Sequence, residues 1–284
     1  MTKGVSVPTV ASLRLGATIH RARKAAGLTQ EQLASMLHWT QTTVTRVESG
    51  QTRIEYPKLI ELMRCLDVPE AVRAEMIEHH RAYVRPSWTG HRALIPDWFR
   101  EYSLHEPHAV TIRSWHQGNV PGVLQSTPYM LALFGSPRVE GMTQKIRNRT
   151  ERQNLLESTP HADRTYIIGE STFRRVFSSA GRTVALDQVE HLLGLDGRYP
   201  TLTIRVLTEA IPFLHMPADF TILTFGDDMK PRAYVEWANG ARYKDDPGFV
   251  ADQENAWRRL AAAALDPDRS RRFLENLRHH FRRR

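Results

Sequence analysis

Hydrophobic residues recur every three to four positions between Leu13 and about Tyr83, and this spacing predicts a run of short helices. Leu15 and Ile19 continue the stripe of the first helix, and Gly27 is placed to end that helix in the left-handed conformation. No alternating β-branched run interrupts the stretch. We therefore predict an all-helical unit of five helices with the arrangement of a phage repressor.

Residues that cap helices divide this unit. Thr29 is followed three positions later by Gln32, which is the spacing of a capping box. Thr40 has the same role at the start of the next helix. Pro57 and Pro69 suit the first turns of a fourth and a fifth helix.

The periodicity changes in the second part of the chain. Short alternating β-branched or aromatic runs predict strands near 164–171, 201–208, 219–226 and 232–239. Helical patterns lie between and around them, at 128–135, 143–158, 185–197, 247–265 and 266–281. We predict an α+β domain with a small, mostly antiparallel sheet flanked by helices.

These patterns give a domain organisation. Residues 1–12 are interpreted as a disordered arm and 13–85 as a helix-turn-helix domain. The Pro/Gly-bearing segment 86–100 is interpreted as a linker. Residues 101–284 form the α+β domain, which we expect to mediate dimerisation and to sense a partner protein or a ligand, and which ends in a basic tail.

The segment from Leu28 to Ile54 contains two short capped helices joined by a three-residue turn at 37–39, which is the spacing of a helix-turn-helix. In the turn, His38 occupies a position that often needs a positive φ. Six apolar residues are expected to hold the two helices together: Leu33, Ala34, Leu37, Trp39, Val44 and Val47.

Polar residues gather at the start of the second of these helices. Gln41, Thr42 and Thr43 are followed one turn later by Arg46. Glutamine pairs with adenine, threonine offers a hydroxyl and a methyl group, and arginine binds guanine or phosphate. This helix is therefore predicted to lie in the major groove of double-stranded DNA.

Contacts with the DNA backbone are also predicted. The helix ends at Thr29 and Thr40 present main-chain N–H groups to phosphates, and Arg53 and Lys58 are candidates for gripping the flanking backbone. A solvated helix face is the favoured interpretation of the remaining basic residues of this region, Arg21, Arg23 and Lys24.

Charge supports a polyanionic partner. The formal net charge is +8, with 12 Lys+Arg against 8 Asp+Glu in residues 1–85, 20 against 22 in 86–268 and 7 against 1 in 269–284. The positive charge thus lies at both ends, which suits DNA, although a solvated basic tail is equally consistent with the last residues.

The sequence predicts a cytoplasmic, nucleoid-associated protein. No apolar run reaches the ~18 residues that span a bilayer, and no secretory signal is apparent. The single cysteine, Cys65, fits a reducing compartment and is interpreted as a small core residue.

No convincing catalytic or metal-binding set is visible, so we expect no enzyme activity, no metal and no cofactor. The histidine pairs lack the spacing of metal ligands, and Ser171 lacks the second glycine of a nucleophile elbow. The aromatic residues of the second domain could line a ligand pocket but more often form plain core.

The Thr-Gln opening, the Leu-Ala pair and the closing Glu-Ser-Gly of this segment resemble the Xre family of helix-turn-helix regulators. In that family the residue matching Gln30 both touches DNA and braces the recognition helix. The position of His38 is usually glycine there.

The order of VPGVLQSTPYMLALF, RNRTERQ, TYIIGEST and AAALDPDRSRRFLENL is similar to the WhiJ-type regulators of streptomycetes. This resemblance implies a dimeric regulator of development or antibiotic production with a small, neighbour-encoded partner protein.

The sequence thus predicts a sequence-specific transcriptional regulator that binds a pseudopalindromic operator as a homodimer. Two alternatives stay open. One is an antitoxin-like protein that mainly sequesters its partner, with DNA binding as autoregulation. The other is an enzyme with a DNA-binding appendage.

Overall fold

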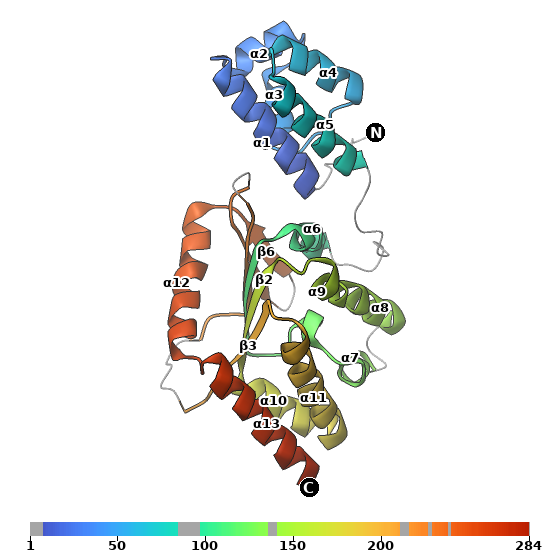
Figure 1. The fold of residues 1–284 in the computed structure, drawn as a ribbon, viewed down its shortest axis with the longest axis vertical. Helices are drawn as coiled ribbons and strands as arrows, with labels where there is room; N and C mark the ends of the chain where they lie inside the picture. The colour runs from blue at the N-terminus through green and yellow to red at the C-terminus, as the bar shows by residue number, and fades with distance from the viewer. Residues whose placement is uncertain are drawn as a thin grey trace. The chain divides into compact units, whose positions relative to one another are not determined.

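The computed structural model describes residues 8–84, 97–135, 141–210, 216–226, 229–237 and 240–283. The chain divides into two compact units, the first built on residues 1–89 and the second containing most of residues 90–284 (Figure 1).

The first unit is entirely helical, as predicted. Its elements are α1 (Val10–Ala25), α2 (Gln30–Met36), α3 (Gln41–Glu48), α4 (Tyr56–Cys65) and α5 (Glu70–Val84).

The first helix begins earlier than the sequence suggested. The Thr9 side chain accepts a hydrogen bond from the Ser12 main chain, and the Ser12 hydroxyl accepts one from the Thr9 main chain, so α1 starts at Val10. The helix therefore extends into the predicted arm at 1–12, of which residues 1–7 lie outside the described part.

Four of these helices end in the same way. The second residue after the helix adopts a left-handed conformation, at Gly27 (φ 72°), His38 (φ 53°), Gly50 (φ 69°) and Asp67 (φ 47°). The next main-chain N–H then bonds back to a carbonyl of the last turn, as from Leu28 to Arg23 (3.2 Å). At each of these residues the chain changes direction sharply, so the next element can pack against the apolar core of the unit.

Two glycines allow α1 to pass very close to the end of α3. A Cβ atom on Gly16 would lie 2.3 Å from the carbonyl oxygen of Glu48, and one on Gly50 would lie 2.9 Å from the main chain of Ser12. Because no larger side chain fits, both positions require glycine. This contact fixes α3 against the rest of the unit.

The second unit is α+β. Its helices are α6 (Asp97–His105), α7 (Thr127–Phe134), α8 (Met142–Gln153), α9 (Leu155–Ser158), α10 (Glu170–Ala180), α11 (Arg182–Arg198), α12 (Pro247–Ala263) and α13 (Pro267–Arg283). Its strands are β1 (Thr111–His116), β2 (Asp163–Gly169), β3 (Leu202–Leu207), β4 (Phe220–Thr224), β5 (Arg232–Trp237) and β6 (Gly240–Lys244). The predicted linker 86–100 lies mostly outside the described residues, and its last four residues belong to α6.

The sheet is mixed, so the prediction of a mostly antiparallel sheet is wrong. The strand order is β3-β2-β1-β4-β5-β6, in which β1, β2 and β3 are parallel and the other pairs are antiparallel. Helices connect β1 to β2 and β2 to β3, and such crossovers return the chain to the same end of the sheet. The sequence pattern had missed β6 and α10 and had indicated only an extended stretch where β1 lies, and without β1 as a strand the parallel pairs cannot be recognised.

The two faces of the sheet differ in chemistry. On one face Trp115, Ile167 and Phe220 pack against Trp257 and Leu260 of α12, which runs along that side of the sheet (Figure 1). The opposite face is partly polar. There Ser114 and His116 of β1 and Tyr234 and Glu236 of β5 point away from α12, because neighbouring residues of a strand alternate.

Candidate DNA-binding surface

The helix-turn-helix consists of α2, the turn and α3. The Thr29 hydroxyl accepts from the Gln32 main chain (3.1 Å), and the Gln32 side chain accepts from the Thr29 main chain (2.7 Å). The Thr40 hydroxyl accepts from the Thr43 main chain (3.2 Å). Both predicted caps are confirmed.

The turn has the geometry that the sequence indicated. His38 adopts the predicted positive φ, and the next residue, Trp39, donates its main-chain N–H to Ala34 (2.8 Å). The six apolar residues predicted to join the helices all belong to the core, with Trp39 at its edge.

Four polar side chains form the exposed face of α3, which we call the α3 face: Gln41, Thr42, Thr45 and Arg46. Thr43 is half-buried, and its hydroxyl lies 2.8 Å from the Thr40 hydroxyl, so it takes part in the cap. Thr45 was not among the predicted DNA contacts. Its place one turn after Gln41 was the signal that could have identified it.

A buried ion pair supports the α3 face from behind. The Arg23 guanidinium of α1 contacts both carboxylate oxygens of Glu48 at 2.5 and 3.0 Å, and the two side chains are only 3% and 5% exposed. Arg23 also donates to the carbonyl oxygen of Leu28 (2.7 Å). The interpretation of Arg23 as a solvated residue is wrong, since it lies inside the unit.

Gln30 connects this ion pair to the α3 face. Its amide nitrogen donates to Glu48 (2.8 Å), and its amide oxygen accepts from the Thr45 hydroxyl (3.0 Å). The bracing role that the family resemblance implied for Gln30 is thus present. Whether Gln30 also touches DNA stays a prediction.

Hydrogen bonds keep Glu48 ionised. Burial by itself raises the pKa of the Glu48 carboxyl, but hydrogen bonds from Arg23, Gln30 and His20 outweigh it and bring the pKa below its ordinary value. The hydrogen bond to Glu48 in turn raises the pKa of Arg23. The pair is therefore charged across the neutral range.

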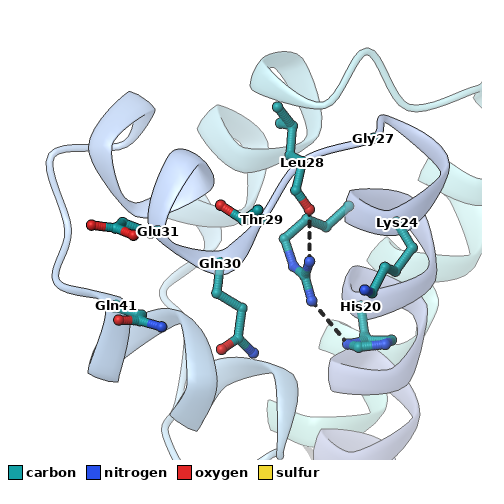
Figure 2. Close-up of a pocket in the computed structure, with 9 residues that line it drawn as sticks. His20, Lys24, Gly27, Leu28, Thr29, Gln30, Glu31 and Gln41 are labelled. Atoms are coloured by element: carbon teal, nitrogen blue, oxygen red, sulfur yellow. Dashed lines mark hydrogen bonds between the residues drawn. The ribbon is translucent and has the colours of Figure 1, made fainter.

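An open hollow of about 510 Å³ lies beside the α3 face, between α1, the start of α2 and the start of α3. In Figure 2, Gln30 stands between His20 of α1 and Gln41 of α3, with Lys24 on the same side as His20. The hollow thus combines basic groups with the amide-bearing residues that are predicted to meet DNA.

The other predicted phosphate contacts lie nearby in sequence. Thr29 and Thr40 cap α2 and α3, Arg53 is exposed in the segment after α3, and Lys58 is exposed in the first turn of α4. Their contacts with DNA stay predictions.

The second unit contains a serine–histidine–aspartate chain. Ser114 Oγ lies 2.8 Å from His116 Nε2, and His116 Nδ1 lies 3.5 Å from Asp219. Ser114 is only 1% exposed, and its hydroxyl also lies 2.6 Å from that of Thr221. A nucleophile must reach its substrate, so this buried serine is placed for a structural role. Ser171, at the start of α10, donates to the Gln117 carbonyl (3.3 Å).

Two kinds of feature are absent from the described ranges. No group of three or more His, Cys, Asp or Glu side chains there could hold a metal ion. No helix in the same ranges is long and apolar enough to cross a membrane.

The two units match different family models. Residues 14–76 match a family model described as a helix-turn-helix domain. Together with the geometry of α2 and α3, this match shows that the first unit is a helix-turn-helix domain. Residues 99–276 match the model described as "Domain of unknown function (DUF5753)". That match spans more than half of the chain, so the protein belongs to the DUF5753 family.

Solved structures match a part of the chain. The restriction-modification controller protein C.AhdI from Aeromonas hydrophila is 28% identical, with coverage of 22% of this chain and 92% of that one and a TM-score of 0.21. The clp gene regulator ClgR from C. glutamicum is 21% identical, with coverage of 26% and 99% and a TM-score of 0.23. No curated protein matches the chain.

The buried pair gives a stability prediction. Glu48→Gln removes one charge and leaves the Arg23 guanidinium buried without a counterion, which should lower the unfolding free energy of the helical unit by about 3 kcal/mol at pH 7. Because the pKa of Glu48 is lowered in the folded state, its contribution is present above the unfolded pKa of about 4.3 and is lost as the pH falls through the folded value.

Urea unfolding at pH 7 and at several pH values below 4, followed by circular dichroism, measures both effects. Glu75→Gln is the matched control, since Glu75 is 35% exposed and pairs with the exposed Arg21, so its loss should cost under about 1 kcal/mol. Equal stability of the Glu48 variant and the native protein at pH 7 would contradict the assignment.

Proposed function

We propose that the protein is a sequence-specific transcriptional regulator that reads its operator with the α3 face. The main observation behind this proposal is that the α3 face is polar and exposed, while the Arg23–Glu48 ion pair behind it is buried and charged. Gln41 and Arg46 are five residues apart on this face and have the side chains that form bidentate hydrogen bonds with adenine and guanine. Thr45, fixed by Gln30, lies between them on the same face.

Phosphate contacts would set the orientation of α3 on the duplex. We propose that the hollow beside Gln41 receives a backbone phosphate, with Lys24 contributing charge and Thr29 at its margin. The N-terminus of α3 at Thr40 and the exposed cations Arg53 and Lys58 would hold the flanking backbone.

Substitutions on the α3 face should reduce specific binding. Gln41→Ala or Arg46→Ala is expected to weaken operator binding by about 1–3 kcal/mol and to leave folding intact, because both side chains are exposed. Fluorescence anisotropy at fixed salt, with an operator selected from random duplexes, measures the loss. Arg64→Ala is the control, since Arg64 is an equally exposed arginine on α4. Operator affinity that is unchanged in both α3 variants would show that α3 is not the reading helix.

We also propose that the protein binds DNA as a homodimer, since one recognition helix contacts only a few base pairs. Two α3 helices roughly 34 Å apart should then protect two half-sites separated by one helical turn. Light scattering gives the mass of the free protein, and footprinting gives the spacing. A monomer that protects one asymmetric half-site would refute the dimer.

A small, neighbour-encoded partner protein is proposed to act on the second unit and to adjust control of development or secondary-metabolism genes. The support is the resemblance to WhiJ-type regulators. The two proteins should co-purify when expressed together, and adding the partner should change the affinity for the operator. Co-purification without any effect on DNA binding would favour the antitoxin-like alternative, and absence of a complex would refute the pairing.

We propose that the second unit has no catalytic role. Ser114 is buried, so the serine–histidine–aspartate chain does not present a nucleophile to a substrate.

A further inference from the structure

His20 of α1 lines the hollow beside the α3 face, one turn before Lys24, and Figure 2 shows both side chains on the same side of it. The His20 side chain is 49% exposed, whereas the Glu48 side chain that it touches is 5% exposed. The imidazole ring thus contacts the buried ion pair and is also open to solvent. The DNA-binding role proposed above leaves this histidine without a function.

The two contacts of the His20 Nδ1 atom make opposite demands. Nδ1 lies 2.9 Å from Oε2 of Glu48 and 3.2 Å from Nη2 of Arg23. A carboxylate only accepts hydrogen bonds and a guanidinium only donates them, so Nδ1 needs a hydrogen to bond Glu48 and a lone pair to bond Arg23. The contact with Glu48 is the shorter one, and the negative charge of its carboxylate favours a hydrogen on Nδ1. Nε2 is then the ring nitrogen that gains or loses a proton.

Protonation of the ring changes what Nε2 presents to a ligand. In the neutral ring with its hydrogen on Nδ1, Nε2 carries a lone pair, which repels a phosphate oxygen. In the imidazolium both nitrogens donate, so Nδ1 keeps its bond to Glu48 while Nε2 can donate to an anion. Within the described residues the hydrogen bonds of the His20 ring involve Nδ1, which leaves Nε2 for such a ligand.

The formal charges around the hollow cancel when His20 is neutral. Arg23 and Glu48 balance each other within the buried pair, and the exposed Lys24 and Glu31 balance each other among the lining residues. A proton on His20 therefore makes the hollow net positive. This change takes place where a backbone phosphate was proposed to lie.

The partners of His20 keep their charges while the histidine titrates. The pKa of the Glu48 carboxyl lies below its ordinary value, so this group stays ionised at neutral and mildly acidic pH. On α5, which also packs against α1, Glu75 pairs with Arg21 and lies 3.4 Å from His79. None of these three side chains forms an ion pair or hydrogen bond with His20 in the described part of the chain.

We propose that protonated His20 binds a backbone phosphate of the operator, so that DNA binding takes up a proton at the α1 side of the hollow. This role rests on the proposed function, because it needs α3 in the major groove beside that phosphate. Protonation and DNA binding then favour each other by linkage. Histidine changes its charge between about pH 5 and 8, so operator affinity should rise as the pH falls through this range.

Fluorescence anisotropy with the selected operator, at constant ionic strength between about pH 5.5 and 8, measures this linkage. The affinity of the native chain should rise by up to about tenfold as the pH falls. His20→Gln retains an amide donor for Glu48 but cannot take up a proton, so the ratio of native to variant affinity should grow as the pH falls. His279→Gln, which replaces an exposed histidine of α13, is the matched control and should leave the rise unchanged.

Calorimetric titration of the native chain with the operator, in two buffers of different protonation enthalpy, counts the protons directly and does not depend on a variant. Net proton uptake is expected near pH 7, and His20→Gln should reduce it. The same pH dependence in the native and His20→Gln proteins, or no net uptake by the native chain, would overturn this role of His20. It would leave the reading of DNA by α3 intact, which the Gln41→Ala and Arg46→Ala variants test at a single pH. Failure of the native chain to bind any duplex would instead overturn the proposed function and this inference with it.

Discussion

The helical unit depends on one buried ion pair, between Arg23 of α1 and Glu48 at the end of α3. The pair can form because Gly16 and Gly50 let the backbones of these elements approach closely. The Glu48 carboxylate also accepts a hydrogen bond from Gln30, and Gln30 in turn accepts one from the Thr45 hydroxyl. The orientation of the α3 face is therefore set from inside the unit, before any DNA is present, and less ordering has to occur on binding.

The same principle, that a buried cation needs a partner, organises the second unit. Arg113 pairs with Glu254, Arg232 pairs with Glu101 and Asp245, and Arg205 donates to three carbonyl oxygens at the end of α12 and after it. Each of these arginines ties a strand to a helix or to the next strand. Arg149 differs because aromatic contact and a glycine accommodate it, while no carboxylate of the described residues pairs with it.

The topology of the sheet determines where α7 and α8 lie. Because β1 is parallel to β2, the chain leaves β1 through the Gly122 turn and builds α7 and α8 over the polar face of the sheet. The face that carries Trp115 and Phe220 is closed by α12 with apolar contacts. The sheet thus separates an apolar core on one face from polar groups on the other. The half-buried basic residues of α8, Lys145, Arg149 and Arg152, lie on the polar side.

The sequence by itself determined the features that depend on neighbours along the chain. Capping at Thr29 and Thr40, the left-handed His38 and the apolar stripe from Leu33 to Val47 follow from spacings of three to four residues, so α2, the turn and α3 could be predicted almost residue by residue. Only the tertiary structure decided the features that join distant residues. Arg23 and Glu48 are 25 positions apart, and β1 meets β4 more than a hundred positions later, so neither the buried role of Arg23 nor the mixed sheet had a local signal. Local rules fix an element from its own side chains, whereas the partner of a charge or a strand is chosen by the packing of the whole unit.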